Sequence, residues 1–118
     1  MSLARIKFIQ KSLIEKYGII GNVASKYIEA GLNVRILHPT RYGPIHIVVN
    51  GNNIRLAIEV FAESREVPRE VVEKIVEKAK LIKAKPVLIL YGDGPKLTDE
   101  VFELCRKYGV KVRRLRAQ

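Results

Sequence analysis

The stretch KPVLILY, residues 85–91, decides the fold that this sequence predicts. It is short and almost entirely apolar, and the loop Gly92-Asp93-Gly94-Pro95 follows it directly. A strand that is apolar on both faces must be covered on both faces, which is typical of a central strand in an α/β sheet. We therefore expect a sheet with this strand near its centre and helices on both of its faces.

The segments on either side of this strand favour helices and a second strand. Pro68 suits the first turn of a helix whose apolar stripe reaches to about residue 83. Thr98 is a good N-cap for a helix over 98–108, with acidic residues at its positive end. A last strand follows over 110–115. The second half of the chain therefore predicts a β-α-β-α-β order.

The first half of the chain predicts two helices and a meander of strands. Apolar spacing indicates helices over 4–17 and 22–30, and alternation indicates strands over 33–37, 45–49 and 54–61. Residues 50–53, Asn-Gly-Asn-Asn, predict a hairpin turn. The whole chain, residues 1–118, is then one α/β domain with a mixed sheet, in the order α-α-β-β-β-α-β-α-β.

Charge is the strongest feature of the composition. The sequence has 22 Lys and Arg against 12 Asp and Glu, a formal net charge of +10. Such an excess attracts polyphosphate and releases counterions on binding, so we expect nucleic acid as the partner. The single cysteine, Cys105, suits a reducing cytoplasm, and no apolar run is long enough for a membrane span or a signal peptide. Abundant Lys, Arg and Glu with little Gln lean toward a thermophile.

The order of elements, with several local sequences, resembles the restriction-endonuclease-like superfamily, also called PD-(D/E)xK. Within it the chain is most similar to the small archaeal Holliday junction resolvases. The similarity covers roughly residues 18–115 and rests on segments 30–35, 44–48, 56–60, 85–89 and 97–115. The resemblance implies DNA, including branched or junction DNA, as the nucleic acid, and a homodimer as the assembly.

The resemblance also implies a metal-dependent site, which this sequence carries only in part. In that superfamily two carboxylates hold Mg²⁺ or Mn²⁺, the metal activates a water, and a lysine beside them stabilises the developing charge. Here Glu59 stands at the glutamate of the Glu-x-Lys strand, but the lysine position is Phe61 and the aspartate position is His46. Glu59 and His46 are therefore the catalytic and metal-ligand candidates at the motif positions, and Mg²⁺ or Mn²⁺ is needed only if the chain is active.

Substitutes for the missing groups can be named. Glu63 is a possible second carboxylate, His46 with Glu59 a possible transition-metal pair, and Lys74 or Lys78 a possible replacement lysine. The ordinary alternatives are a Glu59 that pairs with a nearby arginine and a His46 that is half-buried with one hydrogen-bond partner. We expect a catalytically inactive or impaired nuclease-fold protein that binds DNA. An active endonuclease, a helix-turn-helix binder over 13–32 and a protein-interaction subunit remain as alternatives.

The candidate nucleic-acid contacts form three groups. In the loop before the second strand, Arg41 can contact phosphate, Thr40 can donate from its hydroxyl, and Tyr42 can stack on an exposed base. The second group is Arg113 and Arg114, which are adjacent in a strand and therefore point to opposite faces of the sheet. The third group is made of the remaining candidates, Lys11, Lys26, Arg35 and Arg116.

Helix 68–83 is not among these candidates. Its acidic and basic residues alternate, which predicts an outward-facing scaffold.

Overall fold

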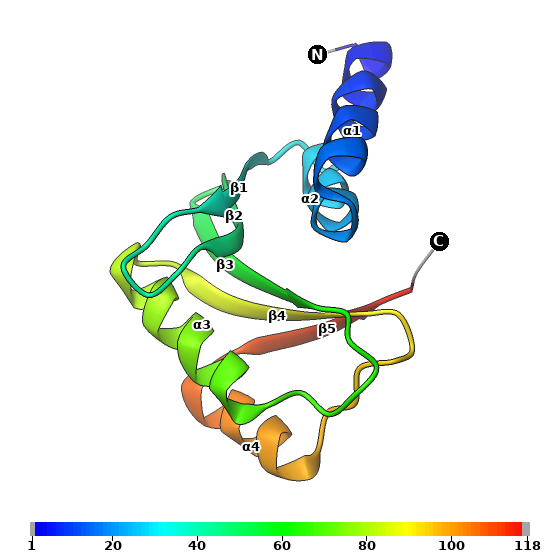
Figure 1. Ribbon diagram of the computed structural model, residues 1–118. Helices are drawn as coiled ribbons and strands as arrows, with labels where there is room; N and C mark the ends of the chain where they lie inside the picture. Colours follow the sequence, from blue (N-terminus) through cyan, green and yellow to red (C-terminus); the bar gives the residue numbers. More distant parts are fainter. Residues whose placement is uncertain (1, 117–118) are drawn as a thin grey trace.

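The computed structural model describes residues 2–116, and the predicted order of elements is confirmed (Figure 1). In chain order the elements are α1 (Leu3–Tyr17), α2 (Ile19–Glu29), β1 (Asn33–His38), β2 (Ile45–Gly51), β3 (Ile54–Phe61), α3 (Arg69–Leu81), β4 (Lys85–Tyr91), α4 (Asp99–Tyr108) and β5 (Lys111–Leu115). Within residues 2–116, no helix combines the length and apolar character that crossing a bilayer requires.

The sheet has five strands in the order β1-β2-β3-β4-β5. β1, β2 and β3 pair antiparallel, whereas β3, β4 and β5 pair parallel. The stretch at 85–91 is therefore an inner strand between two parallel neighbours, as its apolar character predicts. A tight turn at Asn52 and Asn53, both with positive φ, joins β2 to β3.

Helices cover both faces of the sheet, so the predicted fold class is confirmed (Figure 1). Val23 and Ala24 of α2 pack with Ile58 of β3 and Ile89 of β4 on one face. We call this the α2 face. On the other face α3 and α4 pack on the sheet, and we call it the α3/α4 face.

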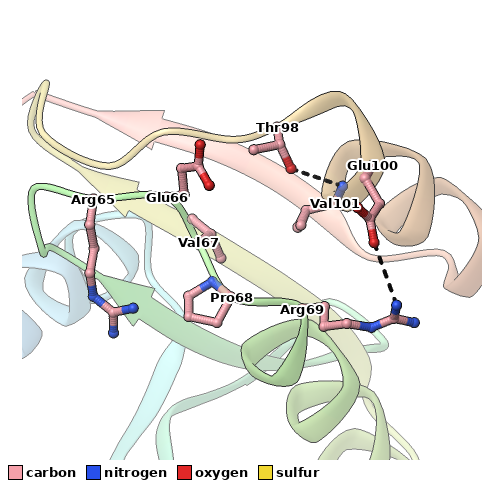
Figure 2. A pocket seen from close by; sticks show the side chains of 8 residues that line it. All are labelled: Arg65, Glu66, Val67, Pro68, Arg69, Thr98, Glu100 and Val101. Carbon is pink, nitrogen blue, oxygen red and sulfur yellow. Dashed lines mark hydrogen bonds and ion pairs between the residues drawn. The ribbon is translucent and has the colours of Figure 1, made fainter.

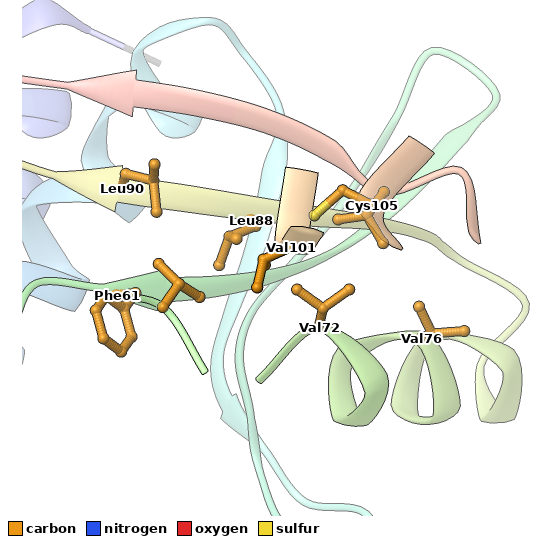
Figure 3. Packing of buried hydrophobic residues seen from close by; sticks show 9 residues of the cluster. Phe61, Val72, Val76, Leu88, Leu90, Val101 and Cys105 are labelled. Atoms are coloured by element: carbon orange, nitrogen blue, oxygen red, sulfur yellow. The ribbon is translucent and has the colours of Figure 1, made fainter. Parts of the chain in front are cut away.

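Phe61 belongs to the core of the α3/α4 face. It is 5% exposed and lies in one cluster with Val72 of α3, Leu90 of β4 and Val101 of α4 (Figure 3). Because strand side chains alternate, Glu59 shares this face with Phe61, two residues away. Cys105, also in the cluster, is 1% exposed, so its thiol is a small core group.

The two N-terminal helices form a hairpin that differs from the sequence prediction at one boundary. Helix α2 begins at Ile19 rather than at residue 22, because Gly21 lies inside the helix instead of stopping it. A Cβ on Gly21 would lie 2.1 Å from the carbonyl oxygen of Leu13, so glycine permits the close approach of α1 and α2. Helix α1 has no buried residue and extends away from the sheet (Figure 1).

Helix α3 buries the apolar stripe that its sequence predicts, but its charged side is not entirely solvent-facing. Its inner side buries Val72, Ile75, Val76 and Ala79, and with them Lys78, which is only 7% exposed. Within this helix Arg69 forms an ion pair with Glu73, at 3.7 Å. One charged residue of the predicted solvent face is therefore part of the interior.

Candidate functional site

His46 and Glu59 lie side by side on the α3/α4 face. His46 is on β2 and Glu59 on the neighbouring β3, and the distance from His46 Nε2 to Glu59 Oε2 is 3.6 Å. Their side chains are 25% and 18% exposed, so both are largely shielded from water. The two residues that the superfamily motif singles out are thus brought together by the pairing of two strands.

Glu59 has an unusual electrostatic environment. Burial raises the pKa of its carboxyl to about 7, and the positive charges of Lys78 and Lys74 oppose this rise. Its Oε1 atom is buried and has no hydrogen-bond partner within the described residues. Near neutral pH the carboxyl is therefore divided between its protonated and ionised forms.

Lys78 closes this cluster from the side of helix α3. Its Nζ donates a hydrogen bond to the carbonyl oxygen of Pro44, at 2.9 Å. Its positive charge acts on both Glu59 and His46. The cluster of His46, Glu59 and Lys78 thus combines one carboxyl, one imidazole and one amine, and we refer to it as the Glu59 cluster.

His46 is held by the backbone of the neighbouring strand. Its Nδ1 accepts a hydrogen bond from the backbone N–H of Val60, at 3.0 Å, so the proton of the neutral ring is on Nε2. Burial, together with the charge of Lys78, lowers the pKa of His46 from its ordinary value. A neutral imidazole that acts as an acceptor in the sheet explains His46 without a metal.

The Glu59 cluster does not fit the divalent metal that the superfamily uses. Mg²⁺ is bound through carboxylates and waters and needs anionic support, but Glu59 is the only carboxyl of the Glu59 cluster. Glu63, the possible second carboxylate, is exposed and pairs with Arg65 at 3.0 Å instead. Across residues 2–116 no three His, Cys, Asp or Glu side chains gather in a way that could hold a metal ion.

The loop that joins β1 to β2 presents part of the predicted nucleic-acid contact. Arg41 and Tyr42 are exposed, and the Arg41 guanidinium lies 5.3 Å from the centre of the Tyr42 ring. The Thr40 hydroxyl donates to the Gly43 carbonyl and accepts from the Tyr42 N–H, so its role is to shape the turn. Lys78 anchors the end of the loop at Pro44.

The other predicted cations are spread over the molecule. Arg35 lines a small groove of about 250 Å³ with His38 and Arg55, on the side of the sheet where the antiparallel strands lie. Lys11 on α1, Lys26 on α2 and Arg116 after β5 are exposed.

The prediction for the pair in β5 is confirmed, because Arg113 and Arg114 serve opposite faces. Arg113 lines a pocket on the α2 face, whereas Arg114 donates hydrogen bonds to the carbonyls of Gly92 and Pro95.

A cavity of about 660 Å³ lies between the segment before α3 and the start of α4 (Figure 2). Three of its charged groups have partners, because Arg69 pairs with Glu100 at 3.5 Å and Arg65 pairs with Glu63 at 3.0 Å, and the Thr98 hydroxyl accepts from the Val101 N–H. None of the residues that the sequence singles out as site candidates lines this cavity. We therefore assign the candidate chemistry to the Glu59 cluster.

Sequence reasoning named Lys78 only as one of two possible replacements and missed its burial. A signal was present, because Val71, Ile75, Lys78 and Ile82 follow helical spacing along the apolar stripe. Lys85 was not singled out at all, and Lys111 was noted only as one cation of the basic run at residues 106–116. Finding them together requires the register of β4 against β5, where Lys111 lies opposite Val87.

Comparison with known proteins gives structural neighbours only. No family model matches this sequence, and no curated protein matches it. The structure of a repair endonuclease from Pyrococcus abyssi is similar with a TM-score of 0.62 and 17% identity, over 95% of this chain and 47% of that one. An EndoMS–dsDNA complex is similar with a TM-score of 0.60 and 17% identity, over 95% and 45% of the two chains.

A third neighbour is SfsA of Pyrococcus furiosus in complex with Ca²⁺, with a TM-score of 0.62 and 10% identity, over 82% of this chain and 56% of that one. The chain thus spans about half the length of the structures that it resembles. At these identities the likeness shows the fold. That fold is α/β and restriction-endonuclease-like, with a five-stranded mixed sheet.

Proposed function

We propose that this chain is a nuclease-fold protein that binds nucleic acid, with DNA favoured, and does not cut it. The observation that carries the proposal is the placement of its cations. Lys78 is the one buried lysine or arginine within residues 2–116, and every other one is exposed to solvent. Exposed cations in such excess bind the phosphate backbone through counterion release.

The cations without an ion-pair partner in the described part of the chain are spread along it, and about half of them lie in the elements near its two ends. Within residues 2–116, Arg65, Arg69 and Arg106 form ion pairs with carboxylates, and all three lie between β3 and the end of α4. The lysines and arginines of α1, α2, β1 and β5 have no carboxylate within 4.0 Å in that part of the chain. These elements supply the free positive charge that a polyanion needs.

The absence of cleavage follows from the donor set of the Glu59 cluster. Cleavage in this fold class needs carboxylates that hold a divalent cation near the phosphate. Here Glu59 is the one carboxyl beside His46, and Lys78 adds a positive charge that acts on it. The DNA complex of a structural neighbour of the same fold supports DNA as the partner.

The test is a titration of the full chain against a labelled duplex and a labelled four-way junction, over a range of salt and with and without Mn²⁺. Binding that weakens steeply with salt, with the DNA left intact, is the expected result. Binding to neither probe would overturn the proposal of a nucleic-acid partner. Cutting that is lost in Glu59→Gln would overturn the proposal of an inactive site.

Glu63→Gln is the matched control for the cleavage arm. Glu63 is an exposed carboxylate near the end of the same strand, paired with Arg65 and outside the Glu59 cluster. Cutting that is lost in Glu59→Gln but kept in Glu63→Gln assigns the activity to the cluster. Cutting that survives both substitutions identifies a contaminating nuclease.

One observation favours the second candidate, an active metal-dependent endonuclease. Lys78 reaches the end of the Glu59 strand from helix α3, where a lysine could replace the one that Phe61 displaces. The same titration decides between the two candidates. A third candidate is a protein-interaction subunit, since helix α1 exposes the apolar side chains of Leu3 and Phe8. Binding to neither DNA probe would favour this candidate.

Preference for branched DNA and assembly as a homodimer are the finer parts of this proposal. A dimer would present two cationic surfaces to the arms of a junction. The expected results are tighter binding of the junction than of the duplex and a dimeric mass in solution by light scattering. A monomer with equal affinity for both probes would remove these finer parts and leave the proposal of DNA binding intact.

A further inference from the structure

A second pocket lies on the α2 face of the sheet, on the side opposite the Glu59 cluster. Its volume is about 270 Å³, slightly below the range of about 300–1,000 Å³ for sites of drug-sized ligands. Its lining residues come from α2 and three strands and are Tyr27, Ile54, Leu56, Lys85, Pro86, Val87, Gly109, Lys111 and Arg113. We call it the Tyr27 pocket.

The Tyr27 pocket joins an apolar lining to a set of cations. Ile54, Leu56 and Val87 provide apolar surface, and Ile54 remains 39% exposed. Lys85 and Arg113 provide positive charge, as does Lys111, and all three cations are exposed. No aspartate or glutamate lines the pocket, so nothing in its wall neutralises these charges.

The register of the parallel strands explains why the cations gather here. Lys111 lies opposite Val87, and Arg113 lies opposite Ile89, so both share the face on which those apolar side chains pack with α2. Lys85 lies on the same face two residues before Val87. The positive charge of Arg113 also acts on the Tyr27 hydroxyl, where it opposes the rise in pKa that burial causes.

This combination suits one nucleotide. Tyrosine and apolar side chains bind the face of a base, and lysine and arginine bind the phosphates beside it. The Glu59 cluster is less suited to a polyanion, because a carboxyl lies within it and Lys78 is already hydrogen-bonded to Pro44. In a duplex the neighbouring base pairs cover both faces of a base, so the base that enters must be unpaired and unstacked.

We propose that the Tyr27 pocket binds an unpaired nucleotide of a single-stranded nucleic-acid segment, with its base against Tyr27 and its phosphates on Lys85, Lys111 and Arg113. This inference rests on the proposed function and adds the class of nucleic acid that is recognised. It also places the main contact on the face of the sheet away from the Glu59 cluster.

The test measures fluorescence anisotropy with three labelled probes of equal backbone charge. These are an oligothymidine, an abasic strand that has phosphates but no bases, and a fully paired hairpin duplex. The oligothymidine should bind about 5- to 100-fold more tightly than the abasic strand, which is the contribution expected from one stacked base. Equal affinity for these two strands would overturn the inference.

Substitutions then locate the contact. Tyr27→Leu keeps an apolar side chain but removes the ring, and should abolish the preference for the oligothymidine, whereas Tyr27→Phe should keep it. Tyr42→Leu is the matched control, because Tyr42 is the exposed tyrosine of the rival loop. A preference that is lost in Tyr42→Leu and kept in Tyr27→Leu would overturn the inference. Thermal unfolding of each variant confirms that it is folded.

The phosphate contacts have their own readout. Lys85→Ala and Arg113→Ala should each weaken binding of all single-stranded probes and lower the salt slope by about 0.7. Lys80→Ala, which removes an exposed charge on α3, should leave the slope unchanged. An effect of Lys80→Ala equal to that of Arg113→Ala would show diffuse attraction only and overturn the site.

Two further arms separate the possible failures. The first is competition by unlabelled thymidine monophosphate, which should displace the oligothymidine only at a large excess of nucleotide. Displacement at equal nucleotide concentration would show that the pocket binds a free mononucleotide and would overturn the inference. Duplex binding without any preference for unpaired bases would overturn the inference but leave the proposed function standing. Binding to none of the probes would overturn both.

Discussion

The side-chain amine of Lys78 donates a hydrogen bond to the carbonyl of Pro44, 2.9 Å away, and so joins helix α3 to the loop before β2. Lys78 is 7% exposed, and its charge lowers the pKa of both Glu59 and His46. One buried lysine thus acts on the backbone of the loop and on the electrostatics of the cluster.

Lys78→Met removes that hydrogen bond and that charge while keeping most of the packing. The Pro44 carbonyl loses its partner, so the free energy of unfolding at neutral pH should decrease by about 1–3 kcal/mol, measured by urea denaturation. The pKa of Glu59 should rise above about 7, measured by carbon NMR of its carboxyl. Lys80→Met, at an exposed position of the same helix, is the control and should change neither quantity. An unchanged Glu59 pKa in Lys78→Met would contradict the assigned coupling.

Glu59 should make stability depend on pH between 4.5 and about 7. Its folded-state pKa is about 7 and the ordinary pKa of a glutamate is 4.5, so the folded protein binds the proton more tightly than the unfolded chain. The free energy of unfolding therefore decreases as pH rises through this window, by up to about 3 kcal/mol from this group. Glu59→Gln removes the effect, so the stability difference between variant and wild type should shift in favour of the variant from pH 4 to pH 8.

His46 acts in the opposite direction at lower pH. Its folded-state pKa lies below 6.5, so the unfolded chain binds a proton first as pH falls, and stability is lost below pH 6.5. In wild type this loss is offset by the gain at Glu59. The Glu59→Gln variant lacks that gain, so the loss of stability from His46 should appear there as a decrease in melting temperature as pH falls below 6.5. A flat profile in that variant would mean that His46 is not held in the neutral form.

Substitutions of the two adjacent arginines of β5 should change the stability of the protein by different amounts. Arg114→Ala removes the hydrogen bonds to the carbonyls of Gly92 and Pro95 and should lower the free energy of unfolding by about 1 kcal/mol. Arg113→Ala removes an exposed side chain and should change stability by less than about 0.5 kcal/mol. Chemical denaturation of both variants checks this. Equal losses of stability would contradict the opposite roles of the two side chains.

Gly21→Ala should loosen the hairpin of α1 and α2. The added methyl group would meet the backbone of Leu13, which cannot move aside as a side chain can, so we expect a loss of about 1–3 kcal/mol in the free energy of unfolding. Limited proteolysis should cut within α1 sooner than in wild type. Lys26→Ala, an exposed substitution on the same helix, is the control and should leave both measurements unchanged.

Much of the fold could be predicted from periodicity and end signals. The apolar stretch at 85–91 identified an inner parallel strand, and Thr98 marked the start of α4. Gly21 misled the prediction of α2, because a glycine that permits close helix packing has the same sequence signature as one that ends a helix. Local sequence patterns indicate which secondary structure a segment forms, but not which element packs against it.

The candidate site was predictable only as far as neighbouring strands determine it. His46 and Glu59 were expected on adjacent strands, and the antiparallel register of β2 and β3 brings them together. The burial of Lys78 depends on how α3 lies against the sheet, and the gathering of Lys85 and Lys111 depends on the register of β4 and β5. Tertiary packing determines both the burial of Lys78 and the gathering of the two lysines, and local patterns in a single sequence do not reveal that packing.

The packing of Phe61 also bears on whether this sheet can gain a nuclease site through mutation. Position 46 is permissive, since an aspartate there could accept the Val60 N–H just as the His46 ring does. Position 61 is not permissive, because Phe61 is 5% exposed and packs with Val72 and Leu90 (Figure 3). A lysine at that position would bury an unpaired charge in an apolar cluster. The substitution that would introduce the lysine of the motif is therefore blocked by the hydrophobic core, and any evolutionary path through it must first rebuild the contact between α3 and the sheet.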